Sequence, residues 1–154
     1  MARRGILFSI LMISLAACTA QGERYEKAAA RADTGTIYVY RPLGKWNGRG
    51  ENPYVNVAGK LLGRLFAGGY VAYAVPAGEH RVEVVQSLLF LPVWPKGLEV
   101  AVAEGSSTYV KVDQRITSIG GEDGGGVTAR QEVFIEEVDE VTGQAALAKS
   151  RLNE

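Results

Sequence analysis

Residues 69–85 read GYVAYAVPAGEHRVEVV, two runs of alternating residues on either side of a Pro-Ala-Gly turn. In the first run the apolar residues at 71, 73 and 75 fall on one face. In the second run His80 shares one face with the valines at 82 and 84, so both runs have the period-two pattern of β-strands. Pro76 presets the backbone of a tight turn, and Gly78 closes it. The stretch therefore predicts two consecutive strands with a tight turn between them.

The same alternation recurs along the chain, so the class of fold follows from it. A hairpin is expected at Ala58-Gly59, since a glycine at that place accepts a positive φ. The remaining segments with strand character are 36–41, 53–65, 98–103, 108–113 and 130–138. About seven short strands separated by turns predict a mainly β protein, an antiparallel immunoglobulin-like or PEGA-like β-sandwich that covers residues 36–138.

After residue 138 the spacing of small and apolar residues changes to that of a helix. The residues that share one helical face are Val141, Ala145, Ala148 and Leu152. We therefore expect residues 139–154 to form a short C-terminal helix that packs on the sandwich through this face.

The first residues have the composition of a secretory signal peptide. Met1 to Arg4 carries two arginines, the stretch from Gly5 to Ala17 is apolar except for two serines, and Cys18 follows as the only cysteine in the chain. A span of the hydrocarbon core needs about 20 apolar residues, so this stretch is too short to remain in a membrane. We expect residues 1–17 to be a signal peptide that is removed.

Leu15-Ala16-Ala17-Cys18 resembles the lipobox of bacterial lipoproteins, in which the cysteine sulfur receives a diacylglyceryl group and becomes the new N-terminus. The resemblance implies an acyl anchor on Cys18. Thr19 replaces the aspartate that retains such proteins in the inner membrane, which implies the periplasmic leaflet of the outer membrane. Residues 18–35 hold no large apolar residue except Tyr25, so we expect a flexible lipidated tether with a reach on the order of 50 Å.

Three stretches, TIYVYRP (36–42), YVNVAGKLLGRL (54–65) and GGYVAYAVPAGEHRVEV (68–84), resemble a family of bacterial lipoproteins called domain of unknown function 2846. The resemblance covers residues 36 to about 113 and implies a lipid-anchored sandwich with no assigned chemistry. The residues that carry it are Tyr40, Arg41, Pro42, Gly59, Lys60, Gly63, Gly69, Val75, Pro76, Gly78 and His80.

Little in the sequence indicates catalysis or metal binding. A zinc site needs three or four converging ligands and a catalytic histidine needs a nucleophile, but neither accompanies His80, which we expect to stabilise its turn. The acidic residues between 132 and 140 lack the ligand spacing of a calcium loop and are expected to be solvated. Acidic and basic side chains balance at 17 each, so nothing favours nucleic acid. We predict no enzyme, no metal and no cofactor.

Two surfaces remain as candidates for a binding function, either to an envelope protein or to peptidoglycan or another polysaccharide. The first is the apolar connection 88–95, which either caps the core or contacts a partner if it is exposed. Its large apolar residues are Leu88, Leu89, Phe90, Leu91, Val93 and Trp94. The second is a set of aromatic residues on which a sugar could stack, Trp46 and Tyr54 together with Trp94.

Overall fold

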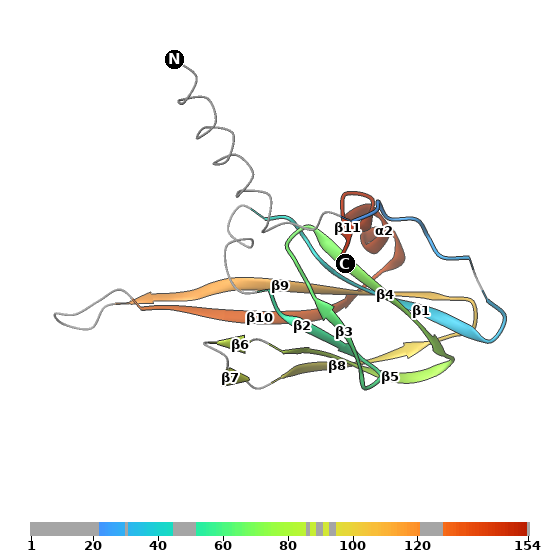
Figure 1. Cartoon of the computed structure of the whole chain (residues 1–154), viewed down its shortest axis with the longest axis horizontal. Helices are drawn as coiled ribbons and strands as arrows, with labels where there is room; N and C mark the ends of the chain where they lie inside the picture. Colours follow the sequence, from blue (N-terminus) through green and yellow to red (C-terminus); the bar gives the residue numbers. More distant parts are fainter. Residues whose placement is uncertain are drawn as a thin grey trace, which may run out of the picture.

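The computed structural model of the chain describes residues 22–29, 31–44, 52–85, 87–88, 91–92, 95–120 and 128–153. In these residues two sheets face each other, with one short helix on the outside (Figure 1). The first sheet contains, in spatial order, β10 (Thr128–Val138), β9 (Ser107–Gly120), β1 (Thr34–Arg41), β4 (Gly69–Pro76) and β11 (Arg151–Leu152). The second contains β3 (Lys60–Arg64), β2 (Tyr54–Val57), β5 (Gly78–Val85) and β8 (Lys96–Val102).

A third, two-stranded sheet pairs β6 (Ser87–Leu88) with β7 (Leu91–Pro92), and the helix is α2 (Glu140–Leu147). The prediction of a mainly β sandwich with a short C-terminal helix is confirmed. The helix is shorter than the range 139–154, because the chain leaves it at Ala148 and continues into β11.

The main core lies between the two large sheets and consists of β-branched residues that alternate along the strands. From β1 it receives Ile37 and Val39, both fully buried, and from β5 it receives Val82 and Val84. Such residues favour strands because their branched side chains pack well on a pleated surface. The other buried members are Val55, Val57, Leu65, Val71, Val75, Val100, Val102, Val110, Val112 and Val133.

Most strand pairs are antiparallel, as predicted, but the first sheet is mixed and two of its pairs are parallel. β1 pairs with β4 antiparallel but with β9 parallel, and β11 also pairs with β4 in parallel. The reason lies in the connections between the sheets. The chain crosses from β8 in the second sheet back to the first, where β9 starts beside Thr36 and runs in the same direction as β1.

The turn at Pro76-Ala77-Gly78 is likewise a crossing between sheets. β4 belongs to the first sheet and β5 to the second, so the two strands that flank this turn do not pair with each other. Gly78 has a φ of 139°, a conformation that residues with a Cβ rarely adopt. The Pro-Ala-Gly sequence therefore makes a corner of the sandwich rather than a β-hairpin.

The outer face of the first sheet carries a second, aromatic cluster. Tyr38 stacks on Tyr109 at a centroid distance of 5.4 Å, and Tyr70 lies 6.4 Å from Tyr38. Leu147 of α2 covers the cluster, and Tyr40 completes it. β1 is therefore buried on both faces.

The helix packs through a different face from the one predicted. Its buried residues are Gly143 and Leu147, whereas Val141 is 79% exposed and the alanines at 145 and 148 are also exposed. The backbone at Gly143 lies so close to the Tyr109 ring that a Cβ at this position would overlap it.

Asp139 caps the helix by accepting a 2.9 Å hydrogen bond from the Thr142 backbone N–H, and bonds from Thr142 lower the pKa of its carboxyl group.

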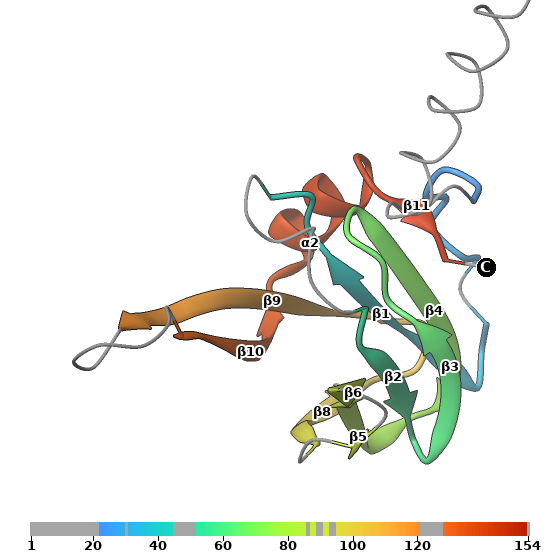
Figure 2. The same cartoon turned by 60° about the vertical axis from the view of Figure 1, so that its left-hand side comes forward.

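Residues 22–29, which we call the N-terminal strap, lie against this aromatic face (Figures 1 and 2). The Tyr25 ring meets Tyr38 and Tyr70 edge-on, at centroid distances of 5.3 and 5.7 Å. Burial holds the pKa of Tyr25 well above its usual range. Part of the segment that the sequence suggested as a tether therefore makes defined contacts with the folded domain.

Replacing Gly143 by alanine is expected to destabilise the fold, although alanine is the better helix former by about 1 kcal/mol. The methyl group would collide with the Tyr109 ring, and overpacking of this kind costs roughly 1–3 kcal/mol. Urea unfolding of the soluble chain from Thr19 onward measures the change. The control is Ala145→Gly on the exposed side of α2, which should lose about 1 kcal/mol through helix propensity alone. A more stable Gly143→Ala variant would contradict the close contact.

Candidate functional site

Several of the predicted site residues lie outside the described residues. These are Cys18, Trp46, Leu89, Phe90, Val93 and Trp94. For Leu88 and Leu91 the backbone is described, and they are opposite each other in the register of the β6–β7 pair. Tyr54 is described in full, on β2.

The predicted partner contact 88–95 is in part a small hairpin beyond the second sheet. β5 and β8 pair as far as Val84 and Lys96, and β2 pairs with β5 as far as Val85. Beyond these residues β6 and β7 pair only with each other. In Figure 1 this hairpin lies at the end of the second sheet that is opposite the Pro76–Gly78 corner.

Tyr54 lies on the outer face of the second sheet, but its ring is engaged by an arginine. The Arg64 guanidinium carbon is 5.1 Å from the ring centroid, and Arg64 Nε donates a 2.9 Å hydrogen bond to the Tyr54 hydroxyl. A sugar stacks on an aromatic ring through an open face, and Arg64 occupies one of the two faces here. The carbohydrate platform stays a prediction that needs Tyr54 to offer its other face.

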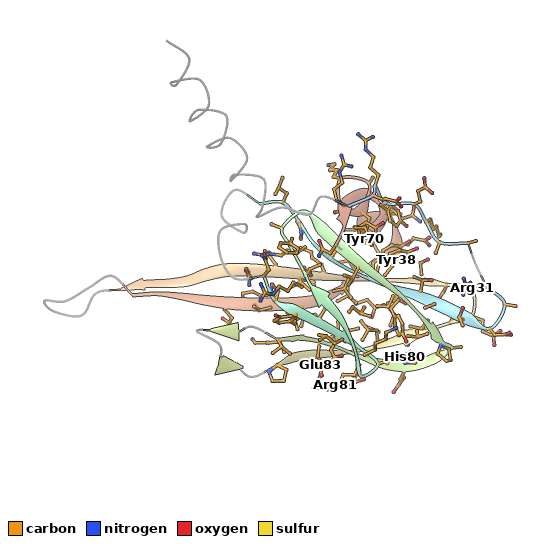
Figure 3. The ribbon with its side chains drawn as sticks, in the orientation of Figure 1. Arg31, Tyr38, Tyr70, His80, Arg81 and Glu83 are labelled. Carbon is orange, nitrogen blue, oxygen red and sulfur yellow. The ribbon has the colours of Figure 1, made fainter. Side chains whose placement is uncertain are left out.

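His80 is bonded to the corner that precedes it. Its Nε2 lies 2.7 Å from the Pro76 carbonyl oxygen, and because that oxygen can only accept, Nε2 carries the proton. Figure 3 places His80 on the side of the molecule away from Tyr38 and Tyr70. The histidine therefore ties β5 back to the end of β4, in the turn-stabilising role expected for it.

The carboxylates of the acidic stretch 132–140 have individual partners. Glu132 pairs with Lys96 at 3.1 Å, and Glu136 pairs with Lys111 at 2.7 Å. Glu140 pairs with Lys27 of the strap, also at 2.7 Å. Within the described residues no three metal-binding side chains come together, and no helix there is long and apolar enough to cross a membrane.

A buried arginine, Arg41 at the end of β1, is the least expected polar group of the domain. Alternation along β1 puts it on the same face as Ile37 and Val39, and it is 0% exposed. Its guanidinium donates a short hydrogen bond to Gln114 Oε1, and bonds of 3.4 and 3.3 Å to the Leu65 carbonyl and to Asn52 Oδ1. Arg41 thus links β1 and β9 to the segments on either side of the β2–β3 hairpin.

Burial lowers the pKa of Arg41, and the negative charge of Asp113 opposes that shift. Arginine is almost never fully buried unless it is paired, so residue type alone would predict an exposed side chain here. Only the alternation along β1, which puts Arg41 on the face of Ile37, indicates that it is buried. Its partners come from distant parts of the chain, and Gln114 is 73 residues away. Arg41 therefore has a structural role: its hydrogen bonds hold four segments together at the end of the core.

Replacing Arg41 by methionine should lower the free energy of unfolding by about 3 kcal/mol. Methionine fills much of the volume but leaves Gln114 Oε1 and the Leu65 carbonyl without this donor, at roughly 1–3 kcal/mol for each buried group. Arg81→Met is the matched control, since Arg81 is an exposed arginine beside Glu83 (Figure 3) that bonds both Glu83 and Glu99. That change should cost far less than Arg41→Met, because ion pairs between exposed side chains are screened by water and contribute little. Equal losses in urea unfolding would contradict the role of Arg41.

Comparison with known proteins adds one finding to this geometry. Neither the curated proteins nor the solved structures contain a match to the chain. A family model described as "Protein of unknown function (DUF2846)" matches residues 31–125. The match begins just before β1 and ends after β9, so it includes the Pro76–Gly78 corner and the buried Arg41. Because it covers more than half of the chain and agrees with the motifs in the sequence, the protein belongs to the DUF2846 family.

Proposed function

We propose that this protein is a lipoprotein of the bacterial cell envelope, anchored through acylated Cys18 in the periplasmic leaflet of the outer membrane. The observation that carries this proposal is the tetrad Leu15-Ala16-Ala17-Cys18 at the end of a short leader that is basic and then apolar. A single thiol without an intramolecular partner also suits an exported protein whose cysteine is acylated. Two or more acyl chains give stable anchoring, at about 0.8 kcal/mol per buried CH₂.

We further propose that the domain is a binding or structural accessory module rather than an enzyme. His80 bonds to the Pro76 carbonyl at the corner, and the carboxylates of Glu132, Glu136 and Glu140 form ion pairs with lysines. These contacts support a role for the groups in the fold. The β6–β7 hairpin is the surface that we propose for contact with an envelope protein. Its position beyond the last residue pairs of the second sheet, together with the apolar composition of residues 88–94, supports this choice.

Replacing Cys18 by serine should move the protein from the membrane fraction to the soluble fraction, since serine has no sulfur to acylate. Intact-mass analysis of the wild-type protein should show a chain that begins at Cys18 and carries the added mass of its acyl groups. Thr19→Ser is the matched control and should leave the protein in the membrane. A wild-type chain with an unmodified thiol, or one that still begins at Met1, would contradict the proposed anchor.

Polar substitution in the hairpin should abolish partner contact and leave the domain folded. We expect a photo-crosslinker at Phe90 to capture one defined envelope protein in intact cells, and Trp94→Ser to reduce that product at least fivefold. A crosslinker at Leu61, an exposed leucine on β3 of the second sheet, should not give this product. If Trp94→Ser instead unfolded the domain, with no product from Phe90, the hairpin would be a cap of the core.

A further inference from the structure

The N-terminal strap is fixed to the domain from its first described residue. Gly22 lies so close to the Leu152 carbonyl oxygen that a Cβ on Gly22 would overlap it. The Leu152 backbone N–H donates a 2.8 Å hydrogen bond to the Glu23 carbonyl, and Arg24 forms an antiparallel bridge with Arg151. The start of the strap is therefore held beside β11, which itself pairs with β4 at Gly69 (Figure 2).

The rest of the strap is also held. The Ala28 backbone N–H donates a 2.7 Å hydrogen bond to the Tyr38 hydroxyl, and Lys27 pairs with Glu140 of α2. Together with the Tyr25 ring contacts, these bonds fasten the strap along the aromatic face. The described strap therefore adds no free length of chain between Gly22 and the domain.

The sequence limits how far the β11 end can lie from the proposed anchor. Gly22 follows Cys18 by four residues, and four fully extended residues span at most about 14 Å. This is much less than the reach on the order of 50 Å expected if all of residues 18–35 were free. If Cys18 is in the bilayer, the β11 end lies at the bilayer surface.

The surface at this end has chemistry that suits lipid headgroups. Arg24 and Arg151 are both exposed and are direct partners in their bridge, so two positive side chains emerge on the same side of the ribbon. Like charges in this position repel each other. In the described part of the chain neither arginine has an ion-pair partner. An anion placed between them would remove the repulsion.

An exposed leucine lies at the same end. Leu43 is 69% exposed and rests beside Gly68, whose carbonyl accepts a 2.9 Å hydrogen bond from the Arg151 backbone N–H. Leucine partitions into the apolar side of the headgroup region, and arginine reaches phosphates from an apolar surface. An apolar side chain and two arginines, which have no ion-pair partner among the described residues, thus lie near Gly22.

We propose, on the basis that Cys18 is acylated as proposed above, that the β11 end of the domain rests on the bilayer in one orientation. Arg24 and Arg151 bind phosphate groups of the lipids, and Leu43 enters the headgroup region. The acyl chains supply the affinity, while these three residues and the short link fix the orientation. The Pro76–Gly78 corner then points away from the membrane, because β4 runs from Gly69 beside β11 to that corner.

The orientation can be measured with a fluorophore on single introduced cysteines, since the acylated protein has no other thiol. Ala148→Cys reports on the β11 end, and Ala77→Cys reports on the corner, about 23 Å away along β4. The full-length acylated protein is reconstituted in vesicles of phosphatidylethanolamine and phosphatidylglycerol with nitroxide headgroups. We expect quenching at residue 148 to be at least twice that at residue 77. Equal quenching at the two sites would overturn the proposal.

Two variants separate the parts of this arrangement. Arg24→Gln with Arg151→Gln should lower quenching at residue 148 at least twofold, whereas the control Arg81→Gln on the other sheet should not. A ten-residue Gly/Ser insertion between Gln21 and Gly22 leaves the strap docked and should bring the ratio of the two sites toward one. Unchanged quenching in the double variant would overturn the phosphate contact, and an unchanged ratio after insertion would overturn the role of the short link. Protein that lacks acyl groups and does not sediment with vesicles would instead refute the proposed anchoring.

Discussion

Burial of both faces of β1 is the constraint on which the rest of the structure depends. Ile37 and Val39 fill the space between the sheets, while Tyr38 and Tyr40 need a cover on the other side. A strand with two apolar faces must occupy the middle of a sheet, and here it lies between β4 and β9. The second sheet covers one face, and α2 with the strap covers the other. The positions of α2 and of the strap follow from this requirement.

Much of this architecture is readable from local pattern. Alternation located the strands, the Ala58-Gly59 and Pro76–Gly78 turns marked where the chain reverses or crosses, and the position of His80 after a tight turn indicated its structural role. The pairing of strands is less accessible. The parallel neighbour of β1 begins about 70 residues further along the chain, and no local pattern identifies it, so a turn-punctuated series of strands suggests antiparallel neighbours throughout.

The features that local pattern missed depend on contacts between distant residues. The buried helix face at Gly143 follows from the Tyr109 ring, and a glycine carries no apolar signal of its own. Tyr25 is not part of an alternating or helical pattern of apolar residues. Its ring packs against Tyr38 and Tyr70, which come together only when β1 and β4 pair. Arg41 faces the core because of its register in β1, but its acceptors are supplied by other segments. In each case the environment of the residue is set by contacts with residues far away in the sequence, which local pattern does not show.

The hydrogen bond between Glu23 and Leu152 also has a consequence for the order of folding. Glu23, near the start of the described chain, bonds to Leu152, near its end. The strap therefore cannot dock fully until nearly the whole chain has been synthesised. Contacts between residues so far apart in the sequence slow folding, because the entropy of closing the long loop is lost before the contact forms. The aromatic face of Tyr38 and Tyr70 therefore stays without the Tyr25 ring until the C-terminal segment is in place.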